Sequence, residues 1–141
     1  MSNQAGLEKE SPRCKIIMYV GTDIVEINRI RSIVKRYPGF YDRVLTGREK
    51  ESGLGRRDPV PFLSGRFAAK EAVLKCIGLG ISRLSFQDME IIPDEAGAPH
   101  VFFSEKMKKI LQERGIGSIS VSISHSRYYA TAVAIGECLD R

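Results

Sequence analysis

The chain has 141 residues, a formal net charge of +5, 43% hydrophobic residues and 28% charged residues. This length and composition suit a single globular domain with an ordinary core, and no apolar run is long enough to span a bilayer. The three cysteines are far apart, so they fit neither a disulfide framework nor a metal site and favour a reducing, cytoplasmic compartment. The positive charge favours an anionic partner: a nucleic acid, a phosphorylated small molecule or an acidic protein.

The N-terminal segment, residues 1–15, differs in composition from the rest of the chain. It is polar, mixed in charge and without the apolar stretch of a signal peptide. We therefore expect a loose tail, followed by one domain over residues 16–141.

A strand and a helix are predicted directly after the tail. The apolar, β-branched run 16–22 is typical of a strand. Asp23, with Glu26 three residues later, resembles a capping box and predicts that a helix begins there. The Pro-Gly pair at residues 38–39 should end this helix near residue 37.

The longest predicted helix covers residues 62–77 and ends at Gly78. Four apolar side chains at helical spacing form a stripe about 80° wide along it. They are Leu63, Phe67, Leu74 and Ile77. Lys70 lies in the middle of this stripe, where an unpaired charge would be costly. Either Lys70 extends to solvent beside an exposed Glu71–Lys75 ion pair, or these charges belong to a functional site.

The remaining predicted elements are shorter. Thr46, with Glu49 three residues later, predicts a helix near residues 47–53, and Ser104 is a good N-cap for another. Alternating or apolar runs predict four strands around that second helix. The strands are 86–92, 101–103, 118–124 and 128–135, and the helix is 105–114. This order predicts a small α+β domain with a mostly antiparallel sheet packed against helices.

Two acidic residues lie at positions where a charged side chain is unexpected. Asp23 ends the first predicted strand, and Glu71 borders the apolar stripe. Asp23 is either a helix cap or, together with Glu71, a ligand of Mg²⁺, which is commonly held by one or two carboxylates and phosphate oxygens. In the second case Arg66, Lys70 and Lys75 lie beside the site, and cations would be left to bind those phosphate oxygens.

Three further basic positions allow two interpretations each. His125, at the tip of a predicted hairpin, is an ordinary turn residue or a phosphate contact. Arg29 and Arg36 lie on a solvated helix face or on a docking surface for an acidic partner. Nucleic-acid binding is disfavoured, because only 8% of residues are aromatic, tryptophan is absent and no nucleic-acid-binding motif occurs.

Three segments of the chain together resemble the holo-(acyl-carrier-protein) synthases, which are small stand-alone 4′-phosphopantetheinyl transferases. They read GTDIVEI, FLSGRFAAKEA and SISHS, at residues 21–27, 62–72 and 122–126. Residues 28–30 and 43–46 also fit, and the resemblance covers roughly residues 17–137. It implies a Mg²⁺-dependent enzyme that transfers 4′-phosphopantetheine from coenzyme A to a serine of apo acyl carrier protein, for fatty acid biosynthesis. 3′,5′-Adenosine diphosphate would be released.

The resemblance also implies roles for individual site residues. Asp23 and Glu71 correspond to the Mg²⁺ ligands, and Lys75 corresponds to a catalytic lysine beside the pyrophosphate. Arg66 and His125 correspond to contacts with the phosphates of coenzyme A. The serine proton needs an acceptor, for which Glu71, directly or through a water, and a water alone are the alternatives.

Family members are usually homotrimers with active sites between subunits, and we expect the same assembly here. Arg29 corresponds to the arginine that contacts the acidic carrier protein, and we assign Arg36 and Arg43 to the same partner. In a trimer Lys70 would face an interface or a partner.

Overall fold

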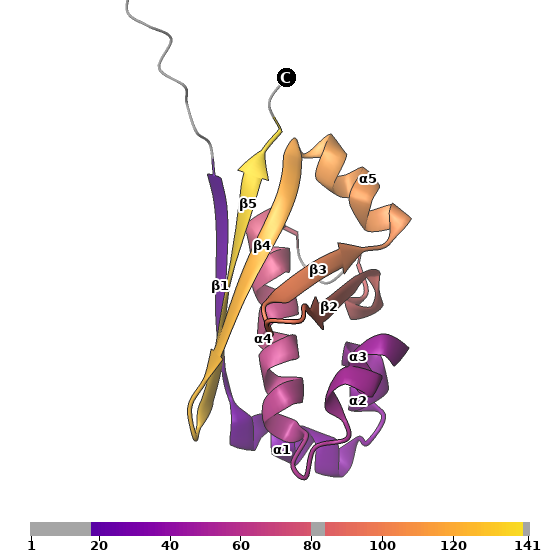
Figure 1. Cartoon of the computed structure of the whole chain (residues 1–141), viewed down its shortest axis with the longest axis vertical. Helices are drawn as coiled ribbons and strands as arrows, with labels where there is room; N and C mark the ends of the chain where they lie inside the picture. The colour runs from indigo at the N-terminus through magenta and orange to yellow at the C-terminus, as the bar shows by residue number, and fades with distance from the viewer. Residues whose placement is uncertain (1–17, 80–83, 140–141) are drawn as a thin grey trace, which may run out of the picture.

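The computed structural model describes residues 18–79 and 84–139 of the chain (Figure 1). The predicted tail over residues 1–15 and the first two residues of the predicted strand 16–22 lie outside these ranges.

A three-stranded antiparallel sheet forms one layer of the domain. Its strands are β1 (Met18–Glu26), β4 (Ile116–His125) and β5 (Tyr129–Cys138), in the order β1-β5-β4. Because side chains alternate between the two faces of a strand, the middle strand β5 presents a row of small residues on one face. These are Ala130, Ala132 and Ala134, all buried.

Helix α4 (Val60–Ile77) packs along this alanine face and is the centre of the fold (Figure 1). Thirteen of its 18 residues are buried. The predicted stripe of Leu63, Phe67, Leu74 and Ile77 does pack inward, but the helix is covered on nearly all sides, so the buried surface is wider than that stripe. Its approach to β1 requires Gly21, since a Cβ there would lie 2.0 Å from the carbonyl oxygen of Ala72. Gly78 ends the helix at φ 81°, in the left-handed conformation that its sequence position predicted.

The remaining elements form a second layer, mostly on the side of α4 away from the sheet (Figure 1). They are α1 (Ile27–Arg36), α2 (Phe40–Val44), α3 (Gly47–Gly53), the short 3₁₀ helix η2 (Phe86–Asp88), β2 (Met89–Pro93), β3 (Pro99–Phe103) and α5 (Glu105–Glu113). β2 and β3 form an antiparallel hairpin of their own. The predicted α+β domain with antiparallel sheets and helices is confirmed.

The junction between β1 and α1 differs from the sequence-based expectation. β1 continues to Glu26, and α1 begins at Ile27, so Asp23 is not a helix cap. Asp23 instead pairs with Ala132 in the middle of the sheet. Pairing with β5 takes the place of the predicted cap, and the first helical amide, that of Ile27, donates to the carbonyl oxygen of Tyr128 at 2.8 Å.

Other local predictions are mostly confirmed. Thr46 and Glu49 form the capping box of α3, and the Ser104 side chain accepts a hydrogen bond from the amide of Met107 at the start of α5. The strand predicted over residues 86–92 is wrong in its first part, because η2 precedes β2. Within residues 18–79 and 84–139, no helix is long and apolar enough to cross a membrane.

The sheet face that points away from α4 is exposed and largely apolar. Its large hydrophobic side chains are Met18, Val20, Ile24, Tyr129, Val133 and Ile135. Val20 and Ile24 are 66% and 65% exposed. An apolar surface that continues across two strands is typical of a protein interface.

Candidate functional site

The side chains of Asp23, Glu71 and Lys75, here called the carboxylate cluster, meet between β1 and α4. Strand alternation points Asp23 toward α4, on the same face as Gly21. The Lys75 ammonium donates to Asp23 Oδ1 at 3.1 Å and to the carbonyl oxygen of Thr22 at 3.0 Å. Glu71 lies one helical turn before Lys75, so it faces the same part of β1.

The carboxylates of this cluster are not fully satisfied by the protein. Asp23 Oδ2 is buried and has no hydrogen-bond partner among the residues that the structure describes. Burial raises the pKa of Glu71, the nearby charge of Asp23 raises it further, and Lys75 opposes both. Two carboxylates that repel each other, one with a free buried oxygen, would gain from a bound cation.

The donor set suits magnesium better than a transition metal. Mg²⁺ takes oxygen ligands and is often held by one or two carboxylates, with phosphate oxygens and waters completing its octahedron. Within the described residues there is no group of three or more His, Cys, Asp and Glu side chains that could hold a metal. The pair Asp23 and Glu71 therefore fits a shared, substrate-assisted metal site.

Arg66 and His125, which the sequence analysis selected as phosphate contacts, line a cavity of about 190 Å³ at the tip of β4. Burial lowers the pKa of Arg66, and its Nε is buried without a hydrogen-bond partner among the described residues. The guanidinium lies 4.6 Å from the centre of the Phe62 ring. A guanidinium that lines a cavity is suited to bind an anion there.

Arg56 is a further residue of this cavity that sequence reasoning missed. Its guanidinium lies 5.0 Å from the centre of the same Phe62 ring. The sequence shows a basic loop at residues 53–59, but it does not indicate which arginine of that loop lines the cavity.

The carboxylate cluster and the Arg66–His125 cavity are separate within one chain. Asp23, Glu71 and Lys75 do not line that cavity. On α4, Glu71 follows Arg66 by five residues, which places the two side chains about 140° apart around the helix. The structure thus brings the predicted residues together in two groups rather than one.

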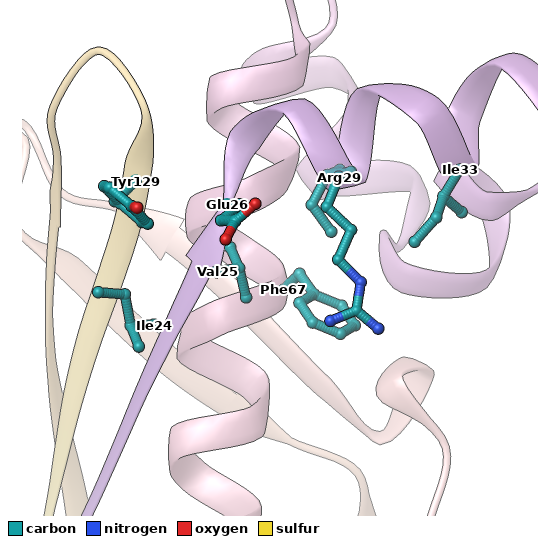
Figure 2. A pocket seen from close by; sticks show the side chains of 8 residues that line it. Ile24, Val25, Glu26, Arg29, Ile33, Phe67 and Tyr129 are labelled. Atoms are coloured by element: carbon teal, nitrogen blue, oxygen red, sulfur yellow. The ribbon is translucent and has the colours of Figure 1, made fainter.

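The three arginines assigned to an acidic partner line two neighbouring cavities. Figure 2 shows the first, where Arg29 and Ile33 of α1 lie on one side and Ile24 and Tyr129 of the sheet on the other. Its volume is about 550 Å³, and Phe67 of α4 also lines it.

The second of these cavities has a volume of about 600 Å³ and is lined by Arg36, Arg43 and, again, Ile33. Arg29, Arg36 and Arg43 thus place positive charge around both cavities; Glu26 also lines the first, and the second is the more apolar of the two.

Comparison with known proteins gives the family. The 4′-phosphopantetheinyl transferase superfamily matches residues 19–134. The chain belongs to this superfamily. It is 46% identical over 118 residues to the holo-[acyl-carrier-protein] synthase of Caldanaerobacter subterraneus subsp. tengcongensis, covering 84% of this chain and 93% of that protein.

Solved structures agree with this assignment. The holo-[acyl-carrier-protein] synthase of Neisseria meningitidis superposes with a TM-score of 0.79 at 36% identity, covering 84% of this chain and 97% of that one. The Helicobacter pylori holo-[acyl-carrier-protein] synthase in complex with coenzyme A superposes with a TM-score of 0.72 at 35% identity, covering 83% and 98%. The resemblance noted in the three sequence segments is confirmed.

Lys70 takes a different place in this phosphopantetheinyl transferase from either sequence-based interpretation. Its side chain is completely buried inside the domain, so it neither extends to solvent nor faces an interface. Its ammonium donates to Glu49 Oε1 at 2.6 Å and to the carbonyl oxygens of Val44 and Phe86 at 2.6 and 3.0 Å. Burial lowers the pKa of Lys70, and the charge of Glu49 opposes that shift. Sequence reasoning had noted Glu49 only as part of a capping box.

Proposed function

We propose that the chain is a holo-[acyl-carrier-protein] synthase, which transfers 4′-phosphopantetheine from coenzyme A to a serine hydroxyl of apo acyl carrier protein. The names of its relatives and the coenzyme A complex of one of them support this proposal. The observation that carries it is the carboxylate cluster, where a buried oxygen of Asp23, beside Glu71 and Lys75, has no hydrogen-bond partner in the described part of the chain.

Asp23 and Glu71 are the residues that would hold Mg²⁺. When bound, the ion would stabilise negative charge on the pyrophosphate oxygens of coenzyme A. Lys75 now donates to Asp23, so a metal on that carboxylate would leave the ammonium available to a phosphate oxygen. Its side chain is 56% exposed and can make this change without disturbing the core.

The reaction forms one P–O bond and breaks another. The serine oxygen of the carrier attacks the β-phosphate, the pyrophosphate P–O bond breaks, and 3′,5′-adenosine diphosphate leaves with the electron pair. The serine proton passes to Glu71, directly or through a water, or to a water alone. Lys75 neutralises charge on the leaving phosphate.

Arg66 and His125 would bind the phosphates of coenzyme A in their cavity, with Arg56 beside them. Because this cavity and the carboxylate cluster are separate in one chain, a complete site needs residues from two subunits. We therefore infer a homotrimer with its active sites between subunits, and the exposed apolar sheet face offers the surface to bury.

The carrier protein would dock on α1 and α2. Arg29, Arg36 and Arg43 would attract its acidic surface, and the apolar cavities between them would receive hydrophobic side chains. Assignment to fatty acid biosynthesis in the cytoplasm follows from the family resemblance and agrees with the free thiols of Cys76 and Cys138.

Intact-mass spectrometry tests the proposed function directly. Apo acyl carrier proteins incubated with the protein, coenzyme A and Mg²⁺ should gain the mass of one phosphopantetheine group. The same reaction with Asp23→Ala should modify the carriers far more slowly. Absence of any modification by the wild-type protein at high enzyme concentration, over several carriers, would refute the proposal.

A further inference from the structure

Helix α4 has no single apolar stripe that would by itself define its rotation about its own axis. Thirteen of its 18 residues are buried, and they lie on nearly every side of the helix. Against the sheet it presents small residues: Ala72 and Cys76 lie against Gly21 of β1, and Gly65 lies against Ile123 of β4. Such a surface lets the helix come close but offers few protruding side chains that interlock.

The Glu49–Lys70 pair adds a polar constraint on the rotation of α4 to the close packing at Gly21. All three protons of the Lys70 ammonium have acceptors, on the end of α2, on α3 and on η2. Glu49 in turn accepts hydrogen bonds from the backbone amides of Thr46 at 2.9 Å and Ile91 at 3.1 Å. Both carboxylate oxygens are therefore bonded, and these contacts are satisfied at only one rotation of α4.

A fully buried ion pair adds little net stability compared with apolar residues of the same size, but it can select one arrangement among several. Glu71 is the next residue after Lys70, about 100° further around the helix. The rotation at which Lys70 reaches Glu49 is thus the rotation at which Glu71 faces Asp23. We propose that the Glu49–Lys70 pair positions Glu71 for catalysis by fixing the rotation of α4; this rests on the proposed role of Glu71.

Lys70→Met tests the proposal, because methionine keeps most of the length and removes the charge. Met107→Ala is the matched control: Met107 is fully buried in α5, and its truncation weakens the core without touching α4's polar contacts. Both variants are assayed at a temperature where circular dichroism shows them folded. The readouts are kcat and the Mg²⁺ concentration that gives half-maximal transfer.

For Lys70→Met we expect the required Mg²⁺ concentration to rise about tenfold or more and kcat to fall by a similar factor, as when a residue behind a metal ligand is removed. Met107→Ala should change neither by more than about twofold. If the two variants have the same kcat and require the same Mg²⁺ concentration, the proposal is overturned. If Lys70→Met does not fold, Glu49→Gln, which keeps the shape of the partner, should give a smaller shift in the same direction.

A crystal structure of the Lys70→Met variant gives a readout independent of activity. The Glu71 carboxylate should be displaced from Asp23 in this variant and unchanged in Met107→Ala. An unmoved Glu71 would overturn the positioning proposal even if the wild-type enzyme is active. Conversely, a wild-type protein that transfers nothing would refute the proposed function, while the displacement of Glu71 would still decide the positioning role.

Discussion

Two lysine–carboxylate pairs join α4 to the rest of the domain, and they differ in how completely their polar atoms are bonded. In the Glu49–Lys70 pair both side chains are fully buried, and every ammonium proton and carboxylate oxygen has a partner. In the Asp23–Lys75 pair the lysine is largely exposed, and one buried carboxylate oxygen has no partner within residues 18–79 and 84–139. All polar atoms of the first pair are bonded without a ligand, whereas a carboxylate oxygen of the second pair can still bind one.

Removing Asp23 from the Asp23–Lys75 pair should have the largest effect, and that effect should be a loss of activity. Asp23→Ala should lower the rate of phosphopantetheine transfer roughly 10³-fold, because charge on the pyrophosphate would lose its stabilisation. Its thermal unfolding should stay close to that of the wild type. Steady-state kinetics at saturating coenzyme A, together with a melting curve, checks both parts; a variant that keeps the wild-type rate at limiting Mg²⁺ would show that Asp23 is not a ligand.

The two lysines should differ in stability when each is changed to methionine. Lys70→Met leaves Glu49 buried without its cation and should cost about 3 kcal/mol of unfolding free energy. Lys75→Met removes a half-exposed contact and should cost less than about 1 kcal/mol. Urea denaturation of the two variants side by side measures the difference, and equal costs would contradict the distinction drawn between the pairs.

The smallest expected effect is the pH dependence of Glu71. Its pKa is raised in the folded protein, so the native state holds this proton more tightly than the unfolded state does. Ionising Glu71 therefore destabilises the fold as the pH rises above the ordinary value of 4.5, by less than about 1 kcal/mol because solvent screens the site.

Glu71→Gln should accordingly be slightly more stable than the wild type at pH 7 and no more stable than it at pH 4. Chemical denaturation at the two pH values tests the sign. A glutamine variant that is less stable at pH 7 would mean that the ionised carboxylate is stabilised by its surroundings.

Much of the fold could be predicted from the sequence, because contacts between residues close in the sequence determine where several helices begin and end. Ser104, the Thr46–Glu49 capping box and Gly78 define helix ends through contacts a few residues apart, and all three are present as predicted. The prediction of a helix cap at Asp23 was wrong because it, too, used only neighbouring residues. Its local pattern predicts a cap, but pairing with a strand more than a hundred residues later determines its conformation.

The candidate functional site could be predicted only in part from the sequence. Asp23, Glu71 and Lys75 stood out as charges beside apolar residues, and the structure brings them together. The partnership of Lys70 with Glu49 was not foreseeable, because it depends on how α3 packs against α4 rather than on spacing. The separation of Arg66 from the carboxylate cluster likewise follows from the rotation of α4 and from the path of β4.

The pairing of β1 with β5 has a consequence for how the protein is made. Asp23 belongs to the first strand, and its carbonyl oxygen accepts a hydrogen bond from the hydroxyl of Thr131 at 3.0 Å, 108 residues later in the chain. During synthesis, β1 can find its neighbour only after residues 129–138, which form β5, have left the ribosome. A nascent chain that lacks β5 therefore has β1 unpaired, and the carboxylate cluster on β1 is not yet held in place.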